Sequence, residues 1–370
     1  MTDTPLVSVR DLRIGAVTDA GRKVEIIRGV DFDIAPGEIL ALIGESGSGK
    51  TTIALSLMGH ARSGCSIQGG TIRVGDHDVT AMSETCRAAL RGTEVSYVPQ
   101  SAAAAFNPSK RIMDQVVEIN SIHGLMPRAE AEARARDLFR ALALPDPDHI
   151  GERYPHQVSG GQLQRLSAAM ALIGDPKLVI FDEPTTALDV TTQIEVLRAF
   201  RSVMDKTGMA GVYVSHDLAV VAQIADRIVV LNGGEIQEEG TTEQILNEPR
   251  HPYTKELLAA FDPVPYATAG GQDANVESPV LEVRGLCAGY GPLENGEPAA
   301  KVLKDVDFQL VRGRNLGVIG ESGSGKSTLA RAIAGILPAY RGTVSFQGQT
   351  LDPDLRARNK DHLRRAQIVF

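Results

Sequence analysis

Residues 28–52 read RGVDFDIAPGEILALIGESGSGKTT, and they contain the clearest indication of the fold class. The apolar run from Ile39 to Ile43 is typical of a buried parallel strand. Gly44 to Thr51 (GESGSGKT) follows it and fits the phosphate-loop pattern G-x-x-x-x-G-K-[ST], which opens a helix. Glycines let backbone N–H groups surround phosphates, and Lys50 can reach the outer phosphates. We therefore expect a nucleotide site in an α/β domain with a parallel-sheet core.

A second copy of this stretch begins at Lys304 and reads KDVDFQLVRGRNLGVIGESGSGKST, which aligns on the first without gaps. A single match could be a chance Gly-rich turn, but two matches in register favour a duplicated domain. The segment between the copies is rich in Pro, Gly and Ala and is typical of a linker. We expect a complete first domain at residues 5–261, a linker at 262–278, and an incomplete second domain at 279–370.

The two loops predict two sets of nucleotide-binding residues for ATP and Mg²⁺. Thr51 and Ser327 supply the hydroxyl groups that fit a Mg²⁺ ligand. The first set is Gly44, Glu45, Ser46, Gly47, Ser48, Gly49, Lys50, Thr51 and Thr52, and the second is Gly320, Gly323, Gly325, Lys326, Ser327 and Thr328.

Residues Leu178 to Pro184 read LVIFDEP, in which two adjacent carboxylates, Asp182 and Glu183, follow an apolar run. Alpha/beta sheets bind ligands at the carboxyl ends of their strands. We expect Asp182 to hold Mg²⁺ and Glu183 to act as general base on the attacking water. Taken alone, the pair could be a solvated acidic turn. The presence of a phosphate loop in the same sequence favours a catalytic role for the two carboxylates.

Val158 to Gln162 reads VSGGQ and is followed by LQR. By spacing alone this is a helix start with Ser159 as N-cap. Together with the other motifs it resembles the signature loop of the ABC ATPases, usually written LSGGQ. The resemblance implies that Ser159, Gly160, Gly161 and Gln162 contact nucleotide, and that Val158 packs.

Further positions match the same family in the same order. Gln100, at the end of SYVPQ, resembles the Q-loop glutamine, and the resemblance implies a contact with Mg²⁺ and catalysis. Asp189, in ALD, resembles the D-loop aspartate, and His216, in YVSHD, resembles the switch histidine at the γ-phosphate. Tyr290 fits the aromatic residue that stacks on adenine, whereas alignment puts Ala16 at that position in the first copy.

Longer stretches narrow the resemblance to one group of ABC proteins. FDEPTTALDVTTQ from Phe181 and NEPRHPYTKELLAA from Asn247 look like the ATP-binding subunits of dipeptide, oligopeptide, nickel and glutathione importers. The alternatives are an exporter of peptide-like compounds and a soluble ABC ATPase without a transport role. The short linker, and the lack of a long insertion between Gln100 and Ser159, disfavour the soluble class. The HPYT segment alone would be a solvated helix start with Pro252 at an early position.

The resemblance implies a P-loop cassette with a parallel-sheet core, an antiparallel β subdomain and a helical signature subdomain. It also implies a sandwich in which the phosphate loop of one cassette faces the signature of a second, in cis or in trans. The implied partners are integral membrane permease subunits and, indirectly, an extracytoplasmic solute-binding protein.

Composition bears on partners and location. A net charge of −8 argues against a nucleic-acid partner. No apolar stretch reaches the roughly 18 residues of a membrane span. The three cysteines are widely separated, which excludes a close-spaced metal or disulfide framework. Because the resemblance implies permease partners and the chain has no apparent span of its own, we expect a peripheral protein at the cytoplasmic face of the inner membrane.

Overall fold

A computed structural model of the chain divides it into two units, Met1–Val264 and Pro265–Phe370. Each unit is described by itself. The structure describes residues 4–17, 21–185, 188–260, 279–294, 296–321 and 323–369.

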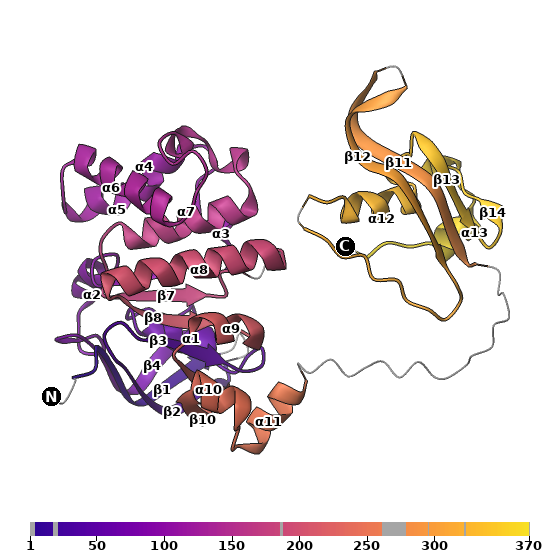
Figure 1. Ribbon diagram of the computed structural model, residues 1–370. Coiled ribbons are helices and arrows are strands. Elements are labelled where there is room, and N and C mark those ends of the chain that lie inside the picture. The colour runs from indigo at the N-terminus through magenta and orange to yellow at the C-terminus, as the bar shows by residue number, and fades with distance from the viewer. Residues whose placement is uncertain are drawn as a thin grey trace. The chain divides into compact units, whose positions relative to one another are not determined.

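The first unit contains a six-stranded sheet in the order β10-β9-β3-β8-β7-β6 (Figure 1). All neighbours in it are parallel except β10, which pairs antiparallel with β9. Every residue of β3, β7 and β8 is buried, as expected for parallel strands that are covered on both faces. The strands are β3 (Ile39–Ile43), β6 (Val95–Val98), β7 (Leu178–Asp182), β8 (Ala210–Val214), β9 (Arg227–Asn232) and β10 (Glu235–Thr241).

An antiparallel sheet in the order β2-β1-β4-β5 covers one face of this core. Its apolar side chains share a buried cluster with Leu40 and Leu42 of β3 and with Ile53. The alternation of buried and exposed residues along β2 is typical of a sheet with one wet face. The strands are β1 (Val7–Val17), β2 (Lys23–Ile34), β4 (Cys65–Val74) and β5 (His77–Asp78).

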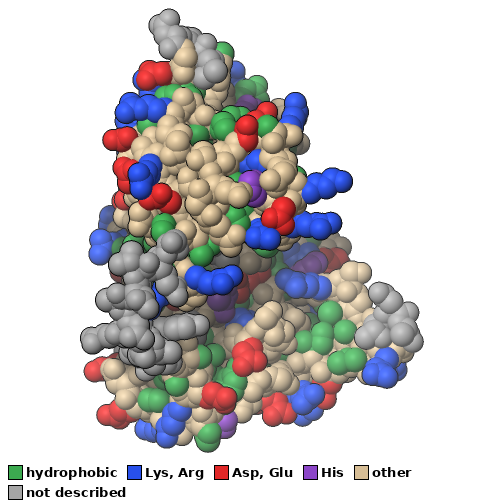
Figure 2. Space-filling view, turned by 90° about the vertical axis from the view of Figure 1, so that its right-hand side faces the viewer, with side chains coloured by type: hydrophobic (Ala, Val, Ile, Leu, Met, Phe, Trp, Pro, Cys, Tyr) green, Lys and Arg blue, Asp and Glu red, His purple; other side chains and the backbone are tan. Residues whose placement is uncertain are grey.

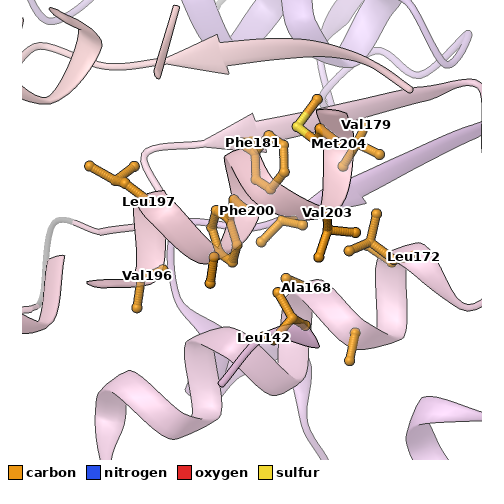
Figure 3. Close-up of a cluster of buried hydrophobic side chains, with 14 of the residues drawn as sticks. Leu142, Ala168, Leu172, Val179, Phe181, Val196, Leu197, Phe200, Val203 and Met204 are labelled. Carbon is orange, nitrogen blue, oxygen red and sulfur yellow. The ribbon is translucent and has the colours of Figure 1, made fainter. Parts of the chain in front are cut away.

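Helices cover the opposite face of the core sheet, and Figure 3 shows how they pack. Phe200 of α8 stacks on Phe181 of β7 with ring centroids 5.0 Å apart, and Ala168 and Leu172 of α7 join the same cluster. This packing fixes the strand that ends in Asp182. The helices of the first unit are α1 (Lys50–Ser56), α2 (Glu84–Leu90), α3 (Ala102–Ala105), α4 (Ile112–Val116), α5 (Glu118–His123), α6 (Arg128–Ala141), η1 (Ile150–Glu152), η2 (Pro155–Gln157), α7 (Gly160–Leu172), α8 (Val190–Thr207), α9 (Leu218–Ile224), α10 (Thr242–Asn247) and α11 (Pro252–Ala259).

The second unit repeats the antiparallel sheet of the first, in the order β12-β11-β13-β14, with α12 packed against it. Residues 315–319, which align on β3, form no strand among the described residues of this unit. The described strands of the second unit all belong to its antiparallel sheet, so residues 315–319 have no parallel strand to pair with. In the first unit β3 pairs with β8 and β9 on its two edges. The elements are β11 (Leu281–Glu294), β12 (Glu297–Leu310), α12 (Lys326–Ala334), β13 (Arg341–Phe346), β14 (Gln349–Thr350), η3 (Leu355–Ala357) and α13 (Lys360–Arg365).

The surface carries charges of both signs. On the face drawn in Figure 2, Lys and Arg side chains are interspersed with Asp and Glu side chains. The sequence has 46 acidic and 38 basic residues. Among the residues that the structure describes, no helix has both the length and the apolar character needed to cross a bilayer.

Candidate nucleotide-binding site

The first phosphate loop joins β3 to α1, and its glycines adopt conformations that other residues avoid. Gly44, Gly47 and Gly49 have φ angles of 147°, 85° and 101°. A Cβ atom on Gly44 would lie 2.1 Å from the carbonyl oxygen of Leu231, so that position has no room for a side chain. The sequence pattern therefore reflects both backbone conformation and close packing on β9.

Lys50 is buried at the start of α1, with its Nζ atom turned back onto the loop. The ammonium group donates to the carbonyl oxygens of Gly44 and Glu45 at 2.8 and 2.7 Å. Burial lowers the pKa of Lys50, and the carboxylates of Glu183 and Asp182 act in the opposite direction. The cation therefore lies in the loop beside the two acidic residues that end β7.

The carboxylate of Asp182 is held on both oxygens. Thr51 Oγ1 donates to Asp182 Oδ1 at 2.8 Å, and the Tyr97 hydroxyl donates to Asp182 Oδ2 at 2.8 Å. Asp182 is only 5% exposed. The phosphate loop and the end of β7 are thus joined by a direct side-chain hydrogen bond.

Glu183 follows with its backbone in the left-handed region, at φ 49°. Its N–H group donates to the carbonyl oxygen of Val214, and this bond continues the pairing of β7 with β8. The side chain meets the other two expected catalytic residues. His216 Nδ1 lies 3.0 Å from Glu183 Oε1, and Gln100 Nε2 donates to Oε2 at 3.2 Å.

These residues surround one cleft of about 730 Å³. This volume lies within the range of about 300–1,000 Å³ that is usual for small-molecule sites. The cleft is lined by Ile26, Ser46, Gly47, Gly49, Lys50, Thr51, Thr52, Arg62, Gln100, Glu183 and His216.

The VSGGQ segment starts a helix, as one of the two interpretations of the sequence predicted. Ser159 caps α7, and its hydroxyl accepts from the N–H of Gln162 while Gln162 Oε1 accepts from the N–H of Ser159. Ser159, Gly161 and Gln162 line a second cavity of about 440 Å³. Asp189 caps α8 by accepting from Thr192. None of Ser159 to Gln162 is among the described residues that line the Lys50 cleft.

Comparison with known proteins decides the family. The ABC transporter family model matches residues 27–186 and 303–370. The chain belongs to the ABC transporter family. It is 37% identical to a peptidoglycan transport ATP-binding protein of Agrobacterium fabrum, over 99% of this chain and 67% of that protein. It is 36% identical to a glutathione import ATP-binding protein of Salmonella typhimurium, over 99% of this chain and 64% of that protein.

Solved structures agree on the fold of an ABC cassette. A dimeric ATP-binding cassette in a post-hydrolysis state with ADP and Pi superposes with a TM-score of 0.57 at 23% identity, covering 64% of this chain and 98% of that one. The structure of cbiO1 from Clostridium perfringens, part of the ABC transporter complex cbiONQ, gives a TM-score of 0.56 at 20% identity, covering 66% of this chain and 91% of that one. The fold class and the family resemblance predicted from the sequence are confirmed. The chain spans about two thirds of the length of the ABC relatives named above.

The second phosphate loop of this ABC chain has the same lysine arrangement as the first. Lys326 Nζ donates to the carbonyl oxygens of Gly320 and Glu321, both at 2.7 Å. The Tyr290 hydroxyl lies 3.2 Å from Thr328 Oγ1, so this aromatic residue is next to the second loop. In the first unit Ala16 pairs with Val24 and Cys65, and no Phe, Tyr or Trp is among the described residues that line the cleft.

Two tyrosines near the first ABC site were missed by sequence reasoning. Tyr97 contacts Asp182. Its position near the end of an apolar strand could have indicated that it lies close to the site. Tyr253, in the HPYT segment, packs on the core, and its hydroxyl accepts from the N–H of Glu45 at 3.4 Å. Pro252 is the first residue of α11, as expected. Ala187 of the expected D-loop lies outside the described residues.

Proposed function

We propose that this chain is an ATP-binding and ATP-hydrolysing subunit that energises transmembrane import of peptides or related small solutes. The observation that carries the proposal is the meeting of Lys50, Thr51, Gln100, Glu183 and His216 around one cleft. Relatives named for glutathione import and peptidoglycan transport support the direction and the substrate class.

Phosphate binding is the task of the first loop. The ammonium group of Lys50 donates hydrogen bonds to two loop carbonyl oxygens in this structure. The same group can turn to the β- and γ-phosphates of ATP. Backbone N–H groups of the loop add further donors. Ala16 stands where Tyr290 stands in the second copy, so among the described residues the nucleobase in the first site meets no tyrosine in the cleft, and Ile26 and Arg62 are the side chains available to it.

The residues at the end of β7 fit Mg²⁺. Thr51 Oγ1 and Asp182 Oδ1 lie 2.8 Å apart and, with the amide oxygen of Gln100, form a set of oxygen donors. Mg²⁺ prefers oxygen ligands and is usually bound by one or two carboxylates plus substrate phosphates. Bound there, the ion would supply charge neutralisation to the phosphate oxygens.

Glu183 is placed to act as general base. His216 Nδ1 lies at one of its oxygens and Gln100 Nε2 at the other, and each carboxylate oxygen keeps a further lone pair that can accept a proton from water. His216 and Gln100 can also turn to the γ-phosphate when ATP is present.

The remaining parts act through partners. We infer that Ser159 to Gln162 contact the nucleotide of a second cassette, in cis or in trans, since they lie outside the Lys50 cleft. The implied arrangement has integral permease subunits, an extracytoplasmic solute-binding protein and a position at the cytoplasmic face of the inner membrane. ATP would close the cassette pair and hydrolysis would release it.

Solute uptake tests this function. Cells that produce the chain with its permease partners should take up labelled dipeptide or glutathione, and Glu183→Gln should stop the uptake. A matched control is Glu130→Gln, which changes an exposed glutamate of α6 and should leave uptake unchanged. Energised efflux would favour the exporter, and ATP hydrolysis that responds to nucleic acid but not to permease would favour the soluble class. Either result would overturn the proposal.

A further inference from the structure

Tyr97 makes a contact with the acidic end of β7 that the proposed function does not use. Its hydroxyl donates to Asp182 Oδ2 at 2.8 Å. Tyr97 is half-buried on β6, and Asp182 is 5% exposed. A hydrogen bond between a hydroxyl and a buried carboxylate belongs to the stronger, charge-assisted class.

Strand pairing explains how the hydroxyl arrives there. β6 and β7 are parallel neighbours, and Tyr97 is paired with Ile180. The carboxyl ends of parallel strands meet at one edge of the sheet. The long phenol side chain extends from Tyr97 to the carboxylate two positions beyond its partner. This placement results from the register of the core sheet, which packing fixes on both faces.

The two oxygens of Asp182 have different partners with different further roles. Oδ1 accepts from Thr51, whose hydroxyl is itself a candidate ligand of Mg²⁺. Oδ2 accepts from Tyr97, and a tyrosine phenol is not among the usual oxygen ligands of Mg²⁺. When Thr51 turns to the metal, the Tyr97 bond still fixes the rotation of the carboxylate.

The hydroxyl is the part of Tyr97 that matters for this contact, because it is the donor to Asp182 Oδ2. A phenylalanine would fill the same space but would leave Oδ2 of a buried carboxylate without this partner.

We propose that Tyr97 is a positioning residue that orients the Asp182 carboxylate for the divalent metal of the nucleotide site. The inference rests on the proposed ATP-binding function. Hydrogen-bond partners behind a metal ligand typically change metal affinity by about 10- to 100-fold when they are removed. Tyr97→Phe should therefore weaken metal binding by about tenfold or more.

Direct titration with Mn²⁺ tests the proposal without catalysis. The EPR signal of free Mn²⁺ reports its binding to the 370-residue chain in the presence of a non-hydrolysable ATP analogue. All variants carry Lys326→Ala, so that the second phosphate loop contributes little. Affinity for the nucleotide in EDTA is measured in parallel. Tyr97→Phe should weaken Mn²⁺ binding while leaving metal-free nucleotide binding within about twofold, because the phosphate loop itself is unchanged.

Tyr213→Phe is the matched control. Tyr213 is a buried tyrosine of β8 in the same sheet, and its hydroxyl lies 3.3 Å from Thr185 Oγ1 and not at Asp182. Its Mn²⁺ affinity should equal that of the parent. Equal Mn²⁺ affinity in Tyr97→Phe and the parent would overturn the inference, and so would an equal loss in both Phe variants. A parent chain that binds neither the analogue nor Mn²⁺ would instead overturn the proposed function.

Discussion

Replacement of Glu183 by glutamine separates binding from chemistry. In the structure Glu183 Oε1 lies 3.0 Å from His216 Nδ1, and Oε2 accepts from Gln100 at 3.2 Å. An amide retains one acceptor oxygen, so Glu183→Gln keeps one of these contacts and loses the other. A lost hydrogen bond of this kind costs about 1 kcal/mol.

Catalysis should suffer far more than binding. A positioned general base contributes about 10²- to 10⁴-fold to rate, which corresponds to about 2.7–5.5 kcal/mol in the activation barrier. Phosphate release at saturating ATP gives kcat, and equilibrium dialysis with labelled ATP gives Kd. We expect kcat to fall at least 100-fold and Kd to change by less than about tenfold. A kcat within tenfold of the parent, with Glu130→Gln as control, would refute the role of Glu183 as base.

Other consequences follow from the same geometry. Lys50→Ala should weaken ATP binding by about 10- to 100-fold in equilibrium dialysis, because a hydrogen bond to a charged group is worth about 1.5–3 kcal/mol; unchanged affinity would refute the site. Phe200→Ala should lower the free energy of unfolding by about 3–5 kcal/mol in urea titrations followed by circular dichroism, because it empties the buried stack on Phe181, and a cost below about 1 kcal/mol would contradict that packing. ATPase activity per molecule should rise with protein concentration if cassettes pair in trans, and a flat dependence would exclude such pairing. Membrane association should require permease subunits, and fractionation of cells that lack them should leave the chain in the supernatant.

Local pattern predicted the framework of the site well. The apolar run Ile39–Ile43 coincides with β3. The apolar run Leu178–Phe181 forms the first four residues of β7, which ends at Asp182. Both predictions succeed because a strand buried on two faces must be apolar throughout, and this is visible in a single sequence. The glycine pattern predicted the phosphate loop for a related reason, since close packing excludes a side chain at Gly44.

The contacts between elements could not be predicted in the same way. The bond from Tyr97 to Asp182 depends on the parallel neighbourhood of β6 and β7, and strand order does not show in local sequence. The contact of Tyr253 with Glu45 joins α11 to a loop from the other end of the unit. The left-handed backbone conformation of Glu183 could not be predicted from the sequence either, because glutamate seldom adopts that conformation.

The second copy shows the limit of reasoning by repeat. Its phosphate loop keeps the lysine arrangement of the first, yet residues 315–319 form no strand. Leu316 and Ile319 are 48% and 94% exposed, whereas their counterparts in β3 are buried. A similar local sequence therefore does not give the same structure when the neighbouring strands of a parallel sheet are not paired with it.

We propose that ATP turnover by this 370-residue chain occurs at the Lys50 loop, around which Gln100, Glu183 and His216 meet. The most direct measurement compares phosphate release by Lys50→Ala and Lys326→Ala, two variants that remove the same contact from the two loops. We expect Lys50→Ala to eliminate ATPase activity and Lys326→Ala to leave it nearly unchanged, because the catalytic side chains surround only the first lysine among the described residues. Equal damage by the two substitutions would contradict the assignment of catalysis to the first site.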